Sequence, residues 1–242
     1  LEYLNQEVLR KVSGALFNDL RMELEEKNSL VKKLSLEMEK VIDLNSRLRT
    51  NFYQTIMSLA AALEARDEYT HGHSERVDYF SILIAKELQS NGHAKMIDDE
   101  FLYNLDIEAK LHDVGKIAIP DAVLNKAGKL TDEEFLLIKT HPVQSAVIVE
   151  PLHDMAESAA VIRHHHERYD GRGYPSGLVG EQIPLRARII AVADSYDAMT
   201  SDRPYRKGMP QEAAIAELVK YTGTQFDPIM TEAFFAALKK LP

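Results

Sequence analysis

The stretch Leu111–Pro120, LHDVGKIAIP, places a histidine directly before an aspartate and a lysine three residues after that aspartate. If the stretch is helical, Lys116 lies on the face next to Asp113, because residues three apart are neighbours on a helix. Adjacent side chains on a helix point about 100° apart. His112 and Asp113 can therefore bind the same cation only if the cation lies close to the helix, and other residues must complete its coordination. A bound cation and the neighbouring lysine together would form a positively charged site for an anion such as phosphate. A lone His-Asp pair is common on protein surfaces, so this hypothesis requires ligands elsewhere in the chain.

The length and charge of the chain narrow its class. Its 242 residues can bury one large or two small cores. The formal net charge of −9 disfavours a nucleic-acid polymer as partner, since non-specific binding of such polymers needs a basic surface. A small anionic substrate stays compatible, because local cations or metals can bind it. The chain has no cysteine, no apolar run of membrane-spanning length and no signal-peptide layout, so we expect a cytoplasmic protein without a membrane span in this segment.

Residues 1–60 contain no proline and carry apolar residues at heptad spacing. One heptad position holds Phe17, Leu24, Val31, Met38, Asn45, Phe52 and Leu59, and the position three residues later holds Leu20, Lys27, Leu34, Val41, Leu48, Thr55 and Ala62. This pattern predicts a parallel two-stranded coiled coil in which Asn45 sets the register. The alternative is one long amphipathic helix lying on the domain. We expect residues 1–54 to form a dimerisation and signalling helix and residues 55–242 to form a second domain.

Beyond residue 51, apolar residues recur at helical spacing and strand-like alternation is absent, which predicts an all-α domain. The expected helical segments are 56–65, 77–88, 101–114, 133–138, 143–149, 155–165, 185–199 and 211–221. Thr131 and Glu134 have the spacing of a capping box, and His141-Pro142 indicates a break. Residues 169–184 contain four glycines and two prolines, which favours an ordered, functional loop.

Imidazoles and carboxylates that could bind metal occur between residues 73 and 194. The candidates are His73, His112, Asp113, His141, His165, His166 and Asp194. Asp194 lies in an apolar segment, where a buried carboxylate needs a cation, either a basic side chain or a metal. Seven such groups exceed the four ligands of a structural zinc site and suffice for two ions that share a carboxylate. Two ions about 3.5–4 Å apart can activate a water and neutralise the leaving oxygen in a displacement at phosphorus.

Five motifs together resemble the HD-GYP family, a branch of the HD phosphohydrolases. They are YTHGHSERV at 69–77, HDVGKIAIPD at 112–121, LTDEEF at 130–135 followed by HP at 141–142, HHERYDGRGYP at 165–175 and ADSYDAMTSDRPYR at 193–206. The resemblance covers about residues 55–225. It implies a helical-bundle HD-type domain that hydrolyses cyclic di-GMP to pGpG and, in some members, on to GMP.

The resemblance also implies a role for each candidate residue. A first metal would be bound by His73, His112, Asp113 and Asp194, and a second by His141, His165 and His166 with Asp113 as the bridge. Lys116, Arg203 and Arg206 match positions that contact substrate phosphate, and Tyr174 lies in the signature loop beside the pocket. Asp113 and Lys116 are the expected catalytic residues, and Lys116 or Asp197 is a candidate to assist deprotonation of the attacking water.

The departures from the family pattern concern the metals. Tyr69 stands where some relatives carry the glutamate ligand of a third metal, so we expect two divalent ions. Iron or manganese is favoured, and nickel, cobalt or zinc are alternatives, because imidazole and carboxylate suit all five. His71, His93, His153 and His164 are not expected to be ligands.

Two alternatives to this activity stay open. One is a module that binds a cyclic dinucleotide or a partner without cutting it, and the other is a phosphodiesterase for 3′,3′-cGAMP. In either case the coiled coil implies a homodimer whose helices relay a signal to the second domain. Relatives carry receiver, PAS or GAF domains upstream, so we expect a sensor or receiver domain before this segment.

Overall fold

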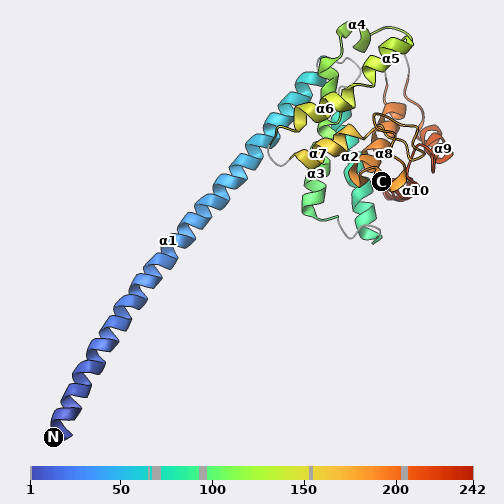
Figure 1. The fold of residues 1–242 in the computed structure, drawn as a ribbon. Coiled ribbons are helices and arrows are strands. Elements are labelled where there is room, and N and C mark those ends of the chain that lie inside the picture. The colour runs from blue at the N-terminus through green and yellow to red at the C-terminus, as the bar shows by residue number, and fades with distance from the viewer. Residues whose placement is uncertain are drawn as a thin grey trace. The chain divides into compact units, whose positions relative to one another are not determined.

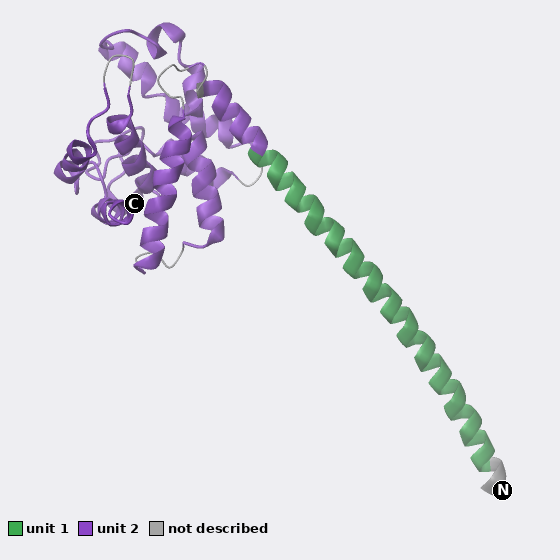
Figure 2. Cartoon of the chain, turned by 180° about the vertical axis from the view of Figure 1, so that it is seen from behind, with its two compact units in different colours: residues 1–53 green, residues 54–242 purple. Residues whose placement is uncertain are grey.

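The structure, a computed structural model, describes residues 2–64, 66, 72–92, 97–152, 155–202 and 207–241. The chain divides into two compact units, residues 1–53 and residues 54–242 (Figure 2). Helix α1 (Glu2–Glu64) forms the described part of the first unit, and its residues 54–64 belong to the second. None of the described helices combines the length and apolarity that a membrane crossing requires.

In the first unit, the side chains of α1 from Asn5 to Asn51 are all exposed. Ion pairs one turn apart, such as Lys27 with Glu23 at 3.1 Å, follow the helix surface and each add a few tenths of a kcal/mol. Phe17 and Leu24 of the predicted seam are 71% and 60% exposed. A row of exposed apolar side chains indicates a surface for association, and the coiled-coil dimer stays a prediction.

The main core of the second unit lies between five helices (Figure 1). They are α2 (His73–Ser90), α3 (Asp99–Leu111), α8 (Leu185–Thr200), α9 (Gln211–Tyr221) and α10 (Pro228–Leu238). Helix α2 packs against α3, α8 and α10. Ile84, Leu105, Ile189 and Phe234, one from each of these four helices, are fully buried, and each contributes about 1.5–3 kcal/mol by its burial. This core holds α2 and α8 side by side.

Shorter helices follow α3 and form a second group. They are the 3₁₀ helix η1 (Val114–Ala118) and the α-helices α4 (Asp121–Leu124), α5 (Asp132–Ile138), α6 (His141–Val149) and α7 (Ala156–Arg163). Helix α6 packs against both η1 and α7. The contact between η1 and α6 is close because Gly115 lacks a Cβ, and its N–H donates a hydrogen bond to Ser145 Oγ at 2.7 Å.

The all-α prediction is confirmed, because the described residues form helices and, apart from two isolated β-bridges, no β-structure. The capping box is also confirmed: Thr131 Oγ1 accepts the Glu134 N–H, and the Glu134 carboxylate accepts the Thr131 N–H at 2.7 Å.

The structure differs from the predicted helices in three details. The segment 101–114 is not one helix, because α3 ends at Leu111 and η1 begins only at Val114. The break predicted at His141-Pro142 is present but lies at residues 139–140, between α5 and α6, and Pro142 is in the first turn of α6, where its missing N–H costs no hydrogen bond. Helices α4 and α10 were not predicted. Helix α4 is a single turn, too short to show a pattern, and α10 is apolar on most of its surface, so its apolar residues show no helical period.

Candidate functional site

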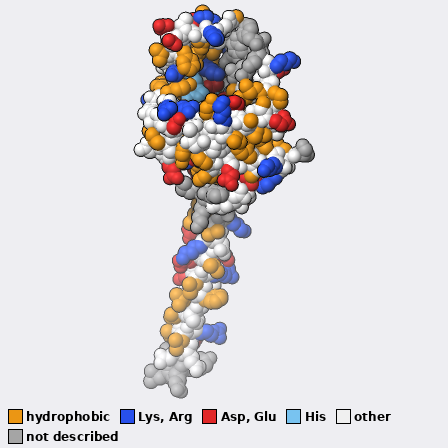
Figure 3. Space-filling view, turned by 90° about the vertical axis from the view of Figure 1, so that its right-hand side faces the viewer, with side chains coloured by type: hydrophobic (Ala, Val, Ile, Leu, Met, Phe, Trp, Pro, Cys, Tyr) orange, Lys and Arg blue, Asp and Glu red, His pale blue; other side chains and the backbone are white. Residues whose placement is uncertain are grey.

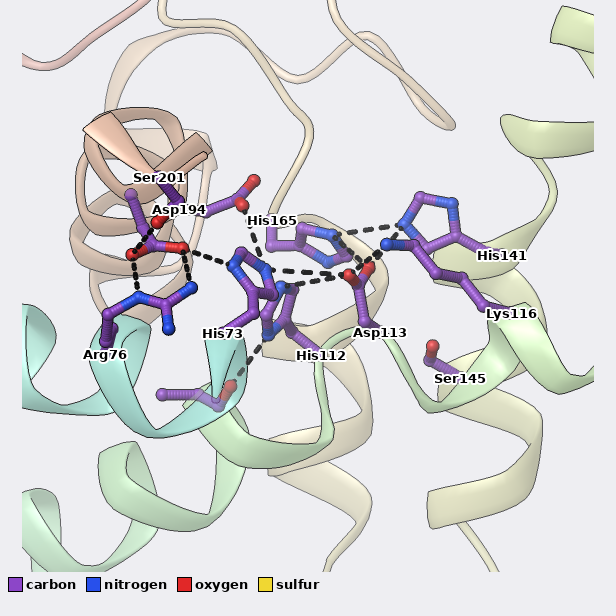
Figure 4. A network of polar contacts seen from close by, with 12 residues as sticks. His73, Arg76, His112, Asp113, Lys116, His141, Ser145, His165, Asp194 and Ser201 are labelled. Carbon is purple, nitrogen blue, oxygen red and sulfur yellow. Dashed lines mark hydrogen bonds and ion pairs between the residues drawn. The ribbon is translucent and has the colours of Figure 1, made fainter. Parts of the chain in front are cut away.

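All seven predicted metal ligands converge in the second unit and form two groups. Asp113, His141, His165 and His166 form one group, and His73, His112 and Asp194 form the other. Within each group, the potential ligand atoms all lie within 4.8 Å of one another. Figure 4 shows six of these side chains pointing toward one another around Asp113.

The packing of the helices explains this convergence. His73 is the first residue of α2 and Asp194 lies in α8, so the α2–α8 contact brings His73 Nε2 to 3.4 Å from Asp194 Oδ1. His141 is the first residue of α6, while His165 and His166 follow the end of α7, and these two helices also pack together. The Asp194 side chain is 17% exposed, so most of it is buried, as its apolar segment predicts, and the rest faces the cavity.

Asp113 lies between the two groups. Its Oδ1 is 3.1 Å from His141 Nε2, and its Oδ2 is 3.5 Å from His112 Nε2 and 3.8 Å from His73 Nε2. Lys116 Nζ contacts the same Oδ2 at 2.6 Å. Burial alone would raise the pKa of Asp113, but the positive charge of Lys116, followed by His112 and His141, holds it well below its usual range. An ionised carboxylate with imidazoles on both sides can bridge two cations.

Hydrogen bonds orient the imidazoles. Three Nδ1 atoms bond to the backbone carbonyl three residues earlier: His112 to Ala109 (2.7 Å), His141 to Ile138 (2.7 Å) and His165 to Ile162 (2.6 Å). A proton on Nδ1 leaves the Nε2 lone pair available to a metal, as in most metal-binding histidines. His112 Nε2 is buried without a hydrogen-bond partner, a cost that a bound cation would remove. The residues therefore fit one or more divalent metal ions.

The protonation states agree with this fit. Burial lowers the pKa of His112, and burial with the neighbouring His166 lowers the pKa of His165 well below its ordinary value. Burial and the nearby His141 lower the pKa of His166 to about 4. These imidazoles are therefore neutral at pH 7, as metal ligands must be. Burial opposes the charged form of His73 as well, but its hydrogen bond to Asp197 and the charge of Asp194 raise its pKa.

A cavity of about 930 Å³ lies next to the two groups, and Figure 3 shows a histidine in a hollow of the surface. Besides His73, Asp113, His141, His166 and Asp194, its lining includes the apolar residues Val123, Leu124, Leu130, Ile138 and Met199 and the cations Lys116, Lys126 and Lys129. This volume is typical of a small-molecule site. Lys116 pairs with Asp113 and Lys126 with Glu134, and Asp194 and Asp197 also line the cavity, so bound metal ions would supply most of the positive charge that an anionic ligand needs.

Tyr174 reaches the cavity from the predicted loop, and its ring centroid lies 5.0 Å from that of His166. The loop contains the short 3₁₀ helix η2 (Gly180–Gln182). Glu167, which is 3% exposed, anchors the loop: its carboxylate accepts the backbone N–H groups of Ser176 (2.7 Å), Gly177 (3.1 Å) and Leu178 (3.2 Å). Sequence reasoning missed this role, although Glu167 directly follows the histidine run.

Some predicted residues lie outside the described part of the chain. They are the substrate contacts Arg203 and Arg206, Tyr69 at the position of a third metal, and His71, His93 and His153. His164 is described and belongs to neither group. Its Nδ1 bonds to the Ala160 carbonyl at 2.7 Å, and its Nε2 lies 3.1 Å from Ser176 Oγ in the loop that carries Tyr174.

Comparison with known proteins yields matches over most of the chain. The model of the HD domain family matches residues 39–230. The chain is 37% identical to the cyclic di-GMP phosphodiesterase response regulator RpfG of Xanthomonas campestris, over 96% of this chain and 60% of that protein. It is 43% identical to the cyclic di-GMP phosphodiesterase PA4108 of Pseudomonas aeruginosa, over 74% of this chain and 42% of that protein.

Among solved structures, the chain is similar in fold to Bd1817, an HDG"Y"P protein of Bdellovibrio bacteriovorus. The TM-score is 0.54 at 23% identity, and the match covers 69% of this chain and 51% of that one. The chain spans less than two thirds of the length of RpfG and of PA4108.

Proposed function

This chain belongs to the HD domain family, and from that premise we propose that it is a metal-dependent phosphodiesterase that hydrolyses cyclic di-GMP to pGpG, with further cleavage to GMP left to the product analysis. The position of Asp113 carries the proposal: it lies between two groups of imidazoles, next to Lys116 and beside a cavity for a small anionic ligand. The names of RpfG and PA4108 support the choice of substrate.

We assign two divalent ions to the site. His73, His112, Asp113 and Asp194 would hold the first, and Asp113, His141, His165 and His166 would hold the second. The imidazole and carboxylate ligands suit all five candidate metals; we assign iron or manganese, with nickel, cobalt or zinc as alternatives. When bound, such ions lower the pKa of a water and offset negative charge on the phosphoryl group.

The side chains around the cavity orient the substrate in this proposal. Lys116 lines the cavity next to Asp113, where its ammonium can bind a phosphate oxygen. Tyr174 presents an aromatic ring on which a guanine base can stack. We assign bidentate phosphate contacts to Arg203 and Arg206, because a guanidinium matches the geometry of two phosphate oxygens. Asp113 and Lys116 are the proposed catalytic residues.

The exposed apolar row of α1 supports a regulatory part of the proposal. Residues 1–54 would form a parallel coiled-coil homodimer that relays the state of an upstream sensor or receiver domain to the catalytic domain, residues 55–242. The protein would act in the cytoplasm, where it meets a cyclic dinucleotide used as a second messenger.

The test is a turnover assay on purified protein loaded separately with each candidate metal, with and without oxygen, and with metal per chain measured in parallel. We expect about two ions per chain and pGpG as the first product. A protein that takes up these metals and binds cyclic di-GMP but releases no pGpG would be a binding module. Faster cleavage of 3′,3′-cGAMP than of cyclic di-GMP would change the substrate and keep the enzyme class.

A further inference from the structure

Asp197 lies behind the metal-binding face of His73. Its Oδ2 accepts a hydrogen bond from His73 Nδ1 at 2.7 Å. Its Oδ1 accepts bonds from Arg76 Nε at 2.5 Å and from the Ser201 hydroxyl at 3.0 Å, and Arg76 Nη2 reaches Oδ2 at 3.1 Å. Figure 4 shows its three partners, His73, Arg76 and Ser201, close to one another. Asp197 is 1% exposed, so these contacts replace its water shell.

This arrangement distinguishes His73 from the other oriented imidazoles. His112, His141 and His165 each follow a helix, α3, α5 or α7, whose last turn supplies the carbonyl for Nδ1. His73 begins α2 directly after Gly72, whose φ of 67° is left-handed. Its Nδ1 bonds to a side-chain carboxylate, that of Asp197 in α8, and not to a backbone carbonyl.

The spacing of the residues makes this contact a property of the α2–α8 interface. His73 and Arg76 are three residues apart on α2, and Asp194 and Asp197 are three apart on α8, so each pair shares a helix face. Asp194 faces His73 Nε2 and Asp197 faces His73 Nδ1. One helix thus contributes a carboxylate to the site and a second carboxylate that supports a ligand of the same site.

Both carboxylate oxygens of Asp197 are engaged in hydrogen bonds with neighbouring side chains. Burial raises the pKa of its carboxyl, but the hydrogen bonds from His73 and Arg76 outweigh burial and lower the pKa to about 2. The group is ionised at neutral pH, and both oxygens accept hydrogen bonds. That Asp197 assists deprotonation stays a separate prediction, and these contacts point to a further role.

We propose that Asp197, held in place by Arg76 and Ser201, is a positioning residue that fixes the tautomer and ring orientation of His73 and strengthens Nε2 as a metal ligand. The inference rests on the proposed binding of metal at this site. Carboxylate partners of metal-binding histidines typically change metal affinity by about 10–100-fold. Because His73 belongs to one group only, we expect the effect at one of the two ions.

The experiment is a calorimetric titration of the metal-free protein with Mn²⁺, comparing the native chain with Asp197→Asn. The variant keeps the size of the side chain and removes its charge, so we expect one site to weaken by about 10–100-fold while the other keeps its native affinity. Asp99→Asn, at an exposed position in the first turn of α3, is the matched control and should bind both ions as the native chain does.

Nitrogen NMR of the metal-free protein reports which nitrogen of His73 carries the proton, and a general loss of stability would not change this tautomer. We expect the His73 proton on Nδ1 in the native chain and a mixture of tautomers in Asp197→Ala. If these variants do not fold, Arg76→Gln tests the same chain of contacts, because the Arg76 side chain is 41% exposed and its removal should still weaken one site several-fold.

The possible failures are distinguishable. A native chain that binds no Mn²⁺ and no other candidate metal would overturn the proposed function and, with it, this inference. A native chain that binds two ions, with Asp197→Asn binding both at native affinity and His73 keeping its tautomer in Asp197→Ala, would overturn the inference alone.

Discussion

Replacing Gly115 with alanine should push apart two helices of the candidate site: η1, which follows Asp113, and α6, which begins at His141. Gly115 lies in η1, two residues after Asp113, and faces the start of α6. An added Cβ would lie 2.2 Å from the His141 carbonyl oxygen and 2.3 Å from the Ser145 backbone nitrogen. Both neighbours are backbone atoms, so no side-chain rotation can relieve the clash.

The free-energy cost follows from these contacts. Ordinary van der Waals contact begins near 3.4 Å, so the two backbones must move apart by about an ångström, and overpacking of this kind costs about 1–3 kcal/mol. The movement also weakens the bond from the Gly115 N–H to Ser145 Oγ (2.7 Å), and a buried N–H left without a partner costs about 1–3 kcal/mol. We expect a total loss of about 2–6 kcal/mol in the free energy of unfolding.

Urea unfolding of the metal-free protein, followed by circular dichroism, measures this loss. Gly14→Ala is the matched control, because nothing lies within 4 Å of its added Cβ and alanine favours a helix interior. Ser145→Ala isolates the hydrogen-bond part, about 1–3 kcal/mol. A Gly115→Ala protein whose unfolding free energy stays within about 0.5 kcal/mol of the native value would refute the reasoning.

The other expectations concern metal, pH and oligomeric state. Asp113→Ala should lose both ions and all turnover, whereas Asp99→Ala should retain them; metal analysis and the pGpG assay decide this. The pKa of His166 is lowered from 6.5 to about 4 in the folded protein. As the pH falls, His166 is therefore protonated in the unfolded chain before it is protonated in the folded one, and this favours unfolding. The metal-free protein should therefore lose up to roughly 3 kcal/mol of stability as the pH falls from 6.5 to 4, and chemical unfolding that shows constant or rising stability across this range would contradict this expectation. The raised pKa of His73 acts above this range, where its stabilising contribution is lost as the pH rises. Removal of residues 1–50 should give a monomer by sedimentation and an altered turnover rate, and an unchanged dimer would exclude the coiled coil as the dimer contact.

Much of the candidate site was predictable because its residues occur in short motifs with chemical meaning. The pair His112-Asp113 and the run His165-His166 are adjacent in sequence, and five motifs in order constrain one another more than any single motif does. The helices were predictable where apolar and polar residues alternate with a helical period, as in α9, and were missed where that contrast fails, as in α10.

The supporting contacts were not predictable in the same way. Asp197 follows the candidate ligand Asp194 by three residues, just as Lys116 follows Asp113. This spacing did not reveal which residue Asp197 contacts. Its partner His73 lies 124 positions away. Glu167 similarly follows the ligand run, but its bonds to the N–H groups of the loop depend on how that loop folds back.

The sequence by itself determined the all-α class and the chemical types of the seven candidate ligands, because helical period and donor atoms are local properties of the chain. Only the tertiary structure decided that Asp113 lies between two groups, that Asp197 supports His73 and that Gly115 sets the distance between η1 and α6. Each of these depends on how closely helices distant in sequence approach one another, and that distance is set by the packing of the whole core.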